Sequence, residues 1–113
     1  FAKKVTDPER FGVVAMDAAG RPVKIEEKPK KHIGDLALVG LYVYDCRCIQ
    51  AARAAKPSER GEIEITEIHN WYLQRGELEV VEIKGEWIDA GTFDSLYRAQ
   101  IFAKEKMAGK MVI

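Results

Sequence analysis

The sequence predicts a domain of mixed helices and strands, of the α/β or α+β class. Three strand-like segments come first, and two helical segments then separate them from two further short strands and a final helix. The third strand-like segment, residues 36–44, is a nearly continuous apolar run, which is typical of a strand buried on both faces. The expected order is therefore β-β-β-α-α-β-β-α, and we expect the strands to form part of a larger sheet.

The composition is that of a soluble globular protein with one domain. The chain has 113 residues, of which 47% are hydrophobic and 32% are charged, and this is enough for a modest core. Its 18 basic and 18 acidic residues cancel, so the net charge favours neither a nucleic-acid nor a membrane partner. No apolar run approaches the roughly 20 residues that span a bilayer. We expect a cytoplasmic protein, with Cys46 and Cys48 as reduced thiols.

The first two predicted strands form a hairpin. They span Phe11–Met16 and Pro22–Glu26, and Asp17–Gly20 between them has the composition of a turn. Residues 1–10 are polar and are expected to form a loop. Gly12, at the head of the first strand, is compatible with a simple strand-entry glycine or with the close approach of a ligand or another backbone.

Two predicted helices follow the apolar strand at residues 36–44. The first spans Cys46–Ala55 and is capped by Asp45. The second spans Ile65–Arg75 and is stopped by Gly76. The side chains expected to be buried on these helices are apolar or aromatic: Ile49, Ala52, Ile65, Ile68, Trp71 and Tyr72.

Two short strands and a long helix complete the prediction. The strands span Leu78–Ile83 and Trp87–Ile88. The helix has Thr92 as its N-cap and ends near Gly109, before a short apolar strand at residues 111–113. Its apolar side chains recur at helical spacing and predict a face buried in the core: Leu96, Ala99, Ala103 and Met107.

Glu27 and Lys28 are the first candidates for function. They follow the second hairpin strand at its carboxyl end, where Pro29 stops regular pairing. Ligands of open α/β sheets bind at that end of the strands. The Glu27 carboxylate can accept hydrogen bonds from hydroxyl groups there, and the Lys28 ammonium can meet a phosphate. The alternative is a solvated pair of opposite charges at a strand end.

Asp89 is the second candidate, because it follows a predicted strand and precedes a helix. Its carboxylate can cap the helix or bind Mg²⁺, which takes only one or two protein carboxylates besides substrate phosphates. Trp87 can stack on a sugar or fill the core. The sequence has no recognisable activated nucleophile and no Gly-rich phosphate loop. An enzyme would therefore need chemistry that relies on positioning and charge neutralisation, such as nucleotidyl transfer.

Five motifs, each weak alone, occur along the chain in one order. They are Phe11-Gly12-Val13-Val14, Ile25-Glu26-Glu27-Lys28-Pro29, Val39-Gly40-Leu41-Tyr42, Arg60-Gly61-Glu62-Ile63-Glu64-Ile65-Thr66 and Trp87-Ile88-Asp89-Ala90-Gly91-Thr92. With them the chain resembles the sugar-1-phosphate nucleotidyltransferases, and most closely the glucose-1-phosphate thymidylyltransferases. The resemblance implies an α/β, Rossmann-like three-layer fold with a mixed sheet, of which residues 1–113 form the sugar-phosphate-binding half.

The resemblance also implies a reaction. Members of the family transfer a nucleotidyl group from a nucleoside triphosphate to a sugar 1-phosphate and release pyrophosphate, with Mg²⁺ as the cofactor and without a covalent intermediate. For this chain the implied substrates are dTTP or UTP and glucose 1-phosphate. A homo-oligomer is implied for the full-length protein, and neither a nucleic acid nor a membrane is an expected partner.

The same resemblance assigns the sugar site residue by residue. Glu27 would bind sugar hydroxyls, and Lys28 would bind the sugar phosphate. Gly12 would offer its backbone to the sugar, next to Phe11, which stands where the family usually has tyrosine. Leu38 stands where the family has a valine that contacts the sugar through its backbone.

The catalytic candidates from the resemblance are Lys28 and Asp89, with Asp89 as one of two Mg²⁺ aspartates and Trp87 lining the pocket. The nucleotide loop and the other metal aspartate belong to the family's N-terminal half. Since the sequence opens at Phe1 inside a charged segment, we expect an excerpt of a longer protein that is inactive alone. Two alternatives stay open. One is a non-catalytic sugar-phosphate-binding or regulatory domain, and the other is a structural domain in which Glu27, Lys28 and Asp89 are only solvated.

Overall fold

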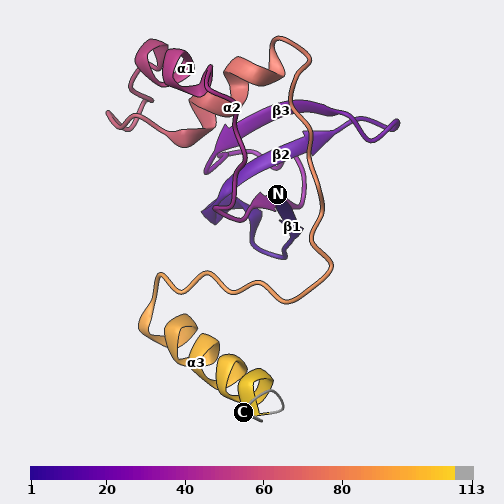
Figure 1. Cartoon of the computed structure of the whole chain (residues 1–113), viewed down its shortest axis with the longest axis vertical. Helices are drawn as coiled ribbons and strands as arrows, with labels where there is room; N and C mark the ends of the chain where they lie inside the picture. The colour runs from indigo at the N-terminus through magenta and orange to yellow at the C-terminus, as the bar shows by residue number, and fades with distance from the viewer. Residues whose placement is uncertain (109–113) are drawn as a thin grey trace.

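Residues 1–108 are described by the structure, a computed structural model, in which two helices lie against a sheet and a third lies apart from it (Figure 1). The elements in chain order are β1 (Ala2–Lys4), the 3-10 helix η1 (Pro8–Arg10), β2 (Gly12–Met16), β3 (Pro22–Glu27), β4 (Leu36–Leu38), α1 (Cys48–Ala54), α2 (Ile65–Leu73) and α3 (Phe93–Ala108). The prediction of mixed helices and strands is confirmed.

The four strands form one sheet in the order β1-β4-β2-β3, and each neighbouring pair is antiparallel. Ala2 adds a parallel bridge to Glu82, so the sheet is mixed, as predicted. The hairpin of β2 and β3 is also confirmed. The Asp17 carboxylate holds its turn by accepting hydrogen bonds from the backbone N–H groups of Ala19 and Arg21, each at 2.9 Å. Antiparallel pairing therefore places the start of β2 beside the end of β3.

The predicted loop over residues 1–10 is wrong at its start, where β1 pairs with β4. Ala2 is fully buried, and its backbone joins two distant parts of the chain. Its N–H donates to the Val81 carbonyl at 3.0 Å, and its carbonyl accepts from the N–H of Ile83 at 2.9 Å. The two lysines that follow Ala2 give the strand a polar composition, so only its long-range partners reveal it.

The predicted strand over residues 36–44 is shorter than expected. β4 ends at Leu38, and the chain turns at Gly40, whose φ is +79°. Beyond the turn the side chains of Leu41 and Val43 are 57% and 84% exposed. A positive φ at glycine interrupts the extended backbone, and the apolar composition of the run does not reveal this turn.

The chain between α2 and α3 is extended and crosses the sheet region before it reaches α3 (Figure 1). The predicted strand over residues 78–83 is reduced to the bridge at Glu82, and the predicted strand at residues 87–88 does not form. This segment carries two of the candidate residues, Trp87 and Asp89. Their positions consequently depend on a few contacts to β1 and β2 rather than on a full strand ladder.

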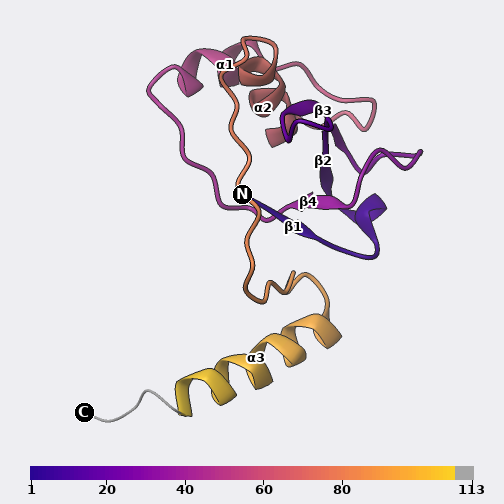
Figure 2. The ribbon, with the colours of Figure 1, turned by 90° about the vertical axis from the view of Figure 1, so that its right-hand side faces the viewer.

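Helix α2 packs on β3, where Asn70 Nδ2 donates to the Ile25 carbonyl at 3.4 Å, and α1 packs on α2 (Figure 2). The buried residues of α2 are Thr66, His69 and Tyr72. Only Tyr72 belongs to the predicted buried face, and Ile65 is 38% exposed. The observed buried face of α2 is therefore shifted by about one residue from the predicted one. Polar and aromatic side chains of α2, rather than its isoleucines, pack against the sheet and the segment after β4.

Helix α1 is shorter than the predicted span of residues 46–55. Asp45 lies just before it, and its carboxylate accepts a hydrogen bond from the backbone N–H of Arg47 at 2.9 Å. Ala51 is the buried residue of the helix. The two positions predicted to be buried are exposed instead: Ile49 and Ala52.

Helix α3 begins where the sequence predicts. Thr92 is its cap, with its Oγ1 accepting from the N–H of Ser95 at 3.2 Å. The predicted core stripe is wrong, because no residue of α3 is buried, and Leu96 and Met107 are 43% and 64% exposed. Both views show α3 away from the sheet (Figures 1 and 2). The predicted stop at Gly109 and the strand at residues 111–113 lie outside the described residues.

The buried core is formed by side chains of β1, β2 and β3. Its central cluster consists of Ala2, Val14 and Ile25, and partly buried side chains surround it: Met16, Leu36, Leu38, Leu73, Leu78 and Val80. Val14 and Ile25 of this cluster pair with each other in the middle of the hairpin. Their burial therefore also holds the open end of the hairpin, where β2 begins and β3 ends. Within residues 1–108, no helix combines the length and the apolar character that a membrane span requires.

His69 of α2 is a buried polar residue. It is 4% exposed, its Nδ1 lies 3.0 Å from the Tyr44 hydroxyl, and its Nε2 has no hydrogen-bond partner among the described residues. The Tyr42 ring lies 4.6 Å from the His69 ring, between centroids. Burial lowers the pKa of His69 to about 4, so the ring is neutral at physiological pH.

We expect the free energy of unfolding to fall as the pH drops from about 6.5 to about 4. The unfolded chain protonates His69 near its ordinary pKa of 6.5, whereas the folded chain does so only near 4, so acid favours the unfolded state by at most about 3 kcal/mol. Urea denaturation at a series of pH values measures this slope. His69→Phe should flatten it, and an unchanged slope in that variant would contradict the assignment.

Candidate functional site

A cleft of about 310 Å³ lies at the open end of the hairpin, where β2 begins and β3 ends. Gly12 pairs with Glu27 at this end. The cleft is lined by Arg10, Phe11, Gly12, Glu27, Leu38, Val39, Gly40, Tyr42, Ile65, Trp87 and Asp89. Its walls therefore come from η1, the hairpin, the chain after β4, the start of α2 and the extended segment before α3.

Gly12 is the floor of this cleft. It is buried, and a Cβ atom at this position would lie 2.9 Å from Glu27 Oε2, 3.1 Å from Thr66 Cγ2 and 3.2 Å from Leu38 Cδ1. Non-bonded carbon and oxygen atoms do not approach so closely, so a side chain at position 12 would displace the atoms around it. Close packing by these three side chains is therefore the observed reason for a glycine here, whereas the sequence suggested strand entry or the approach of a ligand or another backbone.

The Glu27 carboxylate is partly buried, and the net effect of its surroundings is to raise its pKa. Burial and the nearby Glu64 carboxylate raise its pKa, whereas Lys28 and Arg60 lower it. Arg60 itself pairs with Glu64 at 3.2 Å. A partly desolvated carboxylate of this kind gains from hydrogen-bond donors, because few water molecules compete for its oxygens.

Lys28 has an unusual backbone. Its φ is +43°, and among residues 1–108 it is the only residue other than glycine with a positive φ. The N–H of Lys28 donates to the Phe11 carbonyl at 2.9 Å, which fixes this conformation against the start of β2. Strain of this kind is found most often at sites where it serves a function.

The Lys28 side chain borders a second cleft, of about 470 Å³, rather than the first. Arg60 and Lys30 line the same second cleft. Glu27 lines both clefts and separates them. The two clefts thus share the Glu27 side of the site, with the cations Lys28 and Arg60 along the second cleft and Asp89 along the first.

The extended segment brings Trp87 and Asp89 to the opposite wall. The Trp87 ring meets the Phe11 ring edge to face, with 5.3 Å between centroids. Asp89 lines the cleft and turns its carboxylate toward Gly91, where a Cβ atom would lie 3.2 Å from Asp89 Oδ2. Since Thr92 caps α3, the capping alternative for Asp89 is not what the structure shows.

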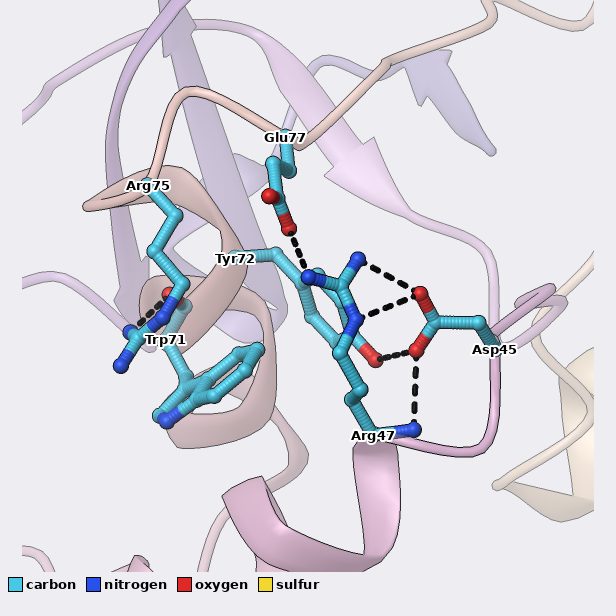
Figure 3. A network of polar contacts seen from close by, with 6 residues as sticks. All are labelled: Asp45, Arg47, Trp71, Tyr72, Arg75 and Glu77. Atoms are coloured by element: carbon cyan, nitrogen blue, oxygen red, sulfur yellow. Dashed lines mark hydrogen bonds and ion pairs between the residues drawn. The ribbon is translucent and has the colours of Figure 1, made fainter.

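An ion-pair network anchors the start of this extended segment (Figure 3). The Arg47 guanidinium donates to Asp45 Oδ2 from Nε at 2.8 Å and from Nη2 at 2.6 Å, and its Nη1 lies 2.8 Å from Glu77 Oε2. The Tyr72 hydroxyl donates to Asp45 Oδ1 at 2.8 Å. The hydrogen bonds from Arg47 and Tyr72 lower the pKa of Asp45 to about 2. The network joins α1, α2 and the segment that leads to the cleft.

The sequence pattern that defines the family described as "Nucleotidyl transferase" matches residues 1–106. The chain belongs to the nucleotidyl transferase family. Its relatives include the glucose-1-phosphate thymidylyltransferase of Neisseria meningitidis, which is 46% identical over 106 residues. The corresponding enzyme of Mycolicibacterium smegmatis is 48% identical over 106 residues. Each alignment covers 92% of this chain and 37% of the relative.

A solved structure supports the same relationship for this nucleotidyl transferase chain. A protein from Bacillus anthracis, described as a glucose-1-phosphate thymidylyltransferase in complex with sucrose, is 47% identical and superposes with a TM-score of 0.81. The superposition covers 91% of this chain and 42% of that one. The resemblance and the α/β nucleotidyltransferase fold expected from the sequence are thereby confirmed, and the chain spans about two fifths of the length of these relatives.

Of the seven site residues expected in this nucleotidyl transferase chain, six line the first cleft: Phe11, Gly12, Glu27, Leu38, Trp87 and Asp89. The seventh, Lys28, lines the adjoining one. Several further lining residues were not predicted, and among them are Arg10, Tyr42 and Arg60. Tyr42 and Arg60 lie inside two of the five motifs, so their positions in those motifs could have identified them as site residues. Arg10 lies just before the first motif, and its polar surroundings gave no such signal.

Proposed function

We propose that residues 1–113 supply the sugar-phosphate site of a sugar-1-phosphate nucleotidyltransferase. The reaction joins glucose 1-phosphate to the nucleotidyl group of dTTP or UTP and releases pyrophosphate. The observation that carries the proposal is the shared cleft of Glu27 and Asp89, which are 62 positions apart in the sequence (89 − 27) and are brought together with Gly12 at the open end of the hairpin.

Each wall of the cleft has a role in this proposal. The Glu27 carboxylate accepts hydrogen bonds from sugar hydroxyls, and the backbone of Gly12, which lines the cleft without a side chain, meets the sugar. Trp87 and Phe11 form an aromatic wall against one face of the sugar. Lys28, held in its strained conformation, reaches the sugar phosphate from the adjoining cleft. Leu38 closes the site beneath Gly12.

The chemistry is an in-line displacement. An oxygen of the sugar phosphate attacks the α-phosphorus of the nucleoside triphosphate, and the bond from that phosphorus to the departing pyrophosphate breaks. Lys28 orients the attacking phosphate and balances its charge. Because both partners are anions, the site must neutralise charge, and this is the work that the cations and the metal aspartate are proposed to do.

The donor set fits Mg²⁺. Glu27 and Asp89 place two carboxylates along one cleft, although no group of three or more His, Cys, Asp or Glu side chains among residues 1–108 could hold a metal alone. Mg²⁺ needs only one or two carboxylates when substrate phosphates and water complete its shell. Asp89 is the residue that would hold it, and Mg²⁺ when bound would neutralise charge on the reacting phosphates.

Further features of the full-length protein belong to the same proposal. We infer a cytoplasmic homo-oligomer in which a second metal aspartate and the nucleotide loop come from outside this chain, so that residues 1–113 alone do not turn over. The length of the relatives, of which this chain spans 37%, supports this division of the site.

The direct test is a pyrophosphate-release assay on the full-length protein with pairs of nucleoside triphosphates and sugar 1-phosphates. We expect release with glucose 1-phosphate and dTTP or UTP. Binding of glucose 1-phosphate without release for any pair would replace the proposal by a non-catalytic sugar-phosphate-binding domain. If glucose 1-phosphate does not bind, both functions are excluded.

Gly12→Ala is expected to raise KM for glucose 1-phosphate about tenfold or more in the full-length protein. The added methyl group would meet Glu27 Oε2 at 2.9 Å and push the carboxylate out of place. Gly85→Ala is the matched control, because no atom lies within 4 Å of its added Cβ. Steady-state kinetics and thermal melting of both variants separate a displaced carboxylate from a general loss of stability. Equal KM values in the two variants would count against the site.

A further inference from the structure

The first cleft contains three charged side chains, Glu27, Asp89 and Arg10. Among its lining residues within 1–108, Arg10 is the only lysine or arginine. Lys28 and Arg60 lie along the adjoining cleft, on the other side of Glu27. A phosphorylated ligand seated between Glu27 and Asp89 therefore meets two carboxylates, and Arg10 is the one lining residue that carries a compensating positive charge.

Two contacts fix the Arg10 guanidinium on the wall of the cleft. Its Nη1 pairs with Asp7 Oδ2 at 2.7 Å, across one turn of η1. Its Cζ lies 5.3 Å from the centroid of the Phe11 ring, whose edge-to-face partner is Trp87. Arg10, Phe11 and Trp87 thus contact one another in turn along one wall, the guanidinium over the Phe11 ring and the two aromatic rings edge to face.

The remaining donors of Arg10 face no recorded partner in the part of the chain that the structure describes. A guanidinium has five N–H donors in a planar fork, and Asp7 occupies only the Nη1 side. The side chain is 51% exposed, so little of its hydration has been removed in the free protein. A planar fork that is already oriented and still has free donors is suited to a phosphoryl group, which it can bind through two parallel hydrogen bonds.

We propose that Arg10 is a substrate-binding residue that receives a phosphoryl group on the Asp89 side of the cleft. The inference rests on the proposed function and adds to it a second cationic contact, on the opposite side of Glu27 from Lys28. Asp7 acts as a positioning residue, because it holds the guanidinium without lining the cleft itself. The phosphoryl group belongs either to the sugar phosphate or to the nucleoside triphosphate.

The test is isothermal titration of the full-length protein with glucose 1-phosphate and, separately, with dTTP and UTP. We expect Arg10→Gln to weaken binding of one of these phosphorylated ligands about tenfold or more, because a hydrogen-bonded charge pair is lost. Weaker binding of glucose 1-phosphate alone assigns the contact to the sugar phosphate, and weaker binding of a nucleotide alone assigns it to the triphosphate. Arg10→Lys should recover part of the affinity.

Arg21→Gln is the matched control. Arg21 also pairs with a nearby aspartate, Asp17, but it lies at the opposite end of the same hairpin. Unchanged affinities in Arg10→Gln would overturn the inference. A fall in all affinities together with the melting temperature would overturn it as well, because that result indicates a structural role. If the wild-type protein bound none of the ligands, the proposed function would fail first, and the inference with it.

Discussion

Replacing Asp89 by asparagine in the full-length protein is expected to lower kcat about 100-fold or more, with KM for the sugar phosphate changed only a few-fold. The amide would keep the shape of the side chain but remove the negative charge that a hard cation prefers. Several kcal/mol of charge neutralisation in the transition state depend on that cation, and each 1.4 kcal/mol is worth about tenfold in rate. Steady-state kinetics over a range of Mg²⁺ concentrations measures the effect, and excess Mg²⁺ should restore part of the rate.

Asp94→Asn is the matched control for this prediction. Asp94 lies five positions further along, in the first turn of α3, and is exposed to solvent. It lines neither of the two clefts. A loss of kcat of similar size in both variants would indicate that the charge acts through α3 rather than through a metal at the cleft. An unchanged kcat in Asp89→Asn would remove Asp89 from the site.

Glu27→Ala is expected to raise KM for glucose 1-phosphate about 30-fold or more, with a smaller change in KM for the nucleotide. A hydrogen bond to a charged group contributes about 1.5–3 kcal/mol, and loss of the carboxylate leaves the sugar hydroxyls without their acceptor. The partial burial that raises the Glu27 pKa also shields this acceptor from water. Kinetics with each substrate varied in turn distinguishes a sugar-specific loss from a general one.

Glu26→Ala is the matched control for Glu27→Ala. Glu26 is the preceding residue of β3, and its carboxylate pairs with Lys24 at 2.6 Å. It borders the second cleft but, unlike Glu27, does not line the first. We expect kinetic constants close to the wild-type values. If Glu26→Ala and Glu27→Ala impaired the enzyme equally, the loss would have to come from the strand end as a whole.

Local chemistry explains which elements the sequence could predict. Asp17 specifies the turn of the hairpin, because its carboxylate accepts hydrogen bonds from two backbone N–H groups within four residues. The start of α3 is set by Thr92, which caps the helix three residues away. Such short-range interactions are visible in sequence because the partners lie within one turn.

The failures involve partners that lie far along the chain. β1 is a strand because Ala2 pairs with Leu38 and Glu82, and neither partner is implied by its polar neighbours. The apolar run that continues after β4 has the composition of a strand, but the turn at Gly40 directs the chain away from the sheet. The stripe on α3 has the spacing of a buried face, yet no residue of that helix is buried in the described structure. Apolar spacing indicates which face can be buried and not what covers it.

The candidate site was predicted from the order of motifs rather than from any one of them. The pairing of Gly12 with Glu27 follows from the hairpin register, so their closeness could be derived from the sequence. The arrival of Asp89 at the same cleft could not, since an extended segment with one bridge to the sheet delivers it there. Arg10 was missed for the opposite reason: an ordinary Asp7–Arg10 pair in a polar stretch carries no mark of a binding role.

A crystal structure of the full-length protein with glucose 1-phosphate and Mg²⁺ tests the central claim most directly. We predict that the sugar lies against Gly12, with a hydroxyl hydrogen-bonded to the Glu27 carboxylate, while its phosphate contacts Lys28 and the metal binds Asp89. A sugar phosphate bound elsewhere, with Glu27 and Asp89 touching neither the sugar nor the metal, would contradict the account.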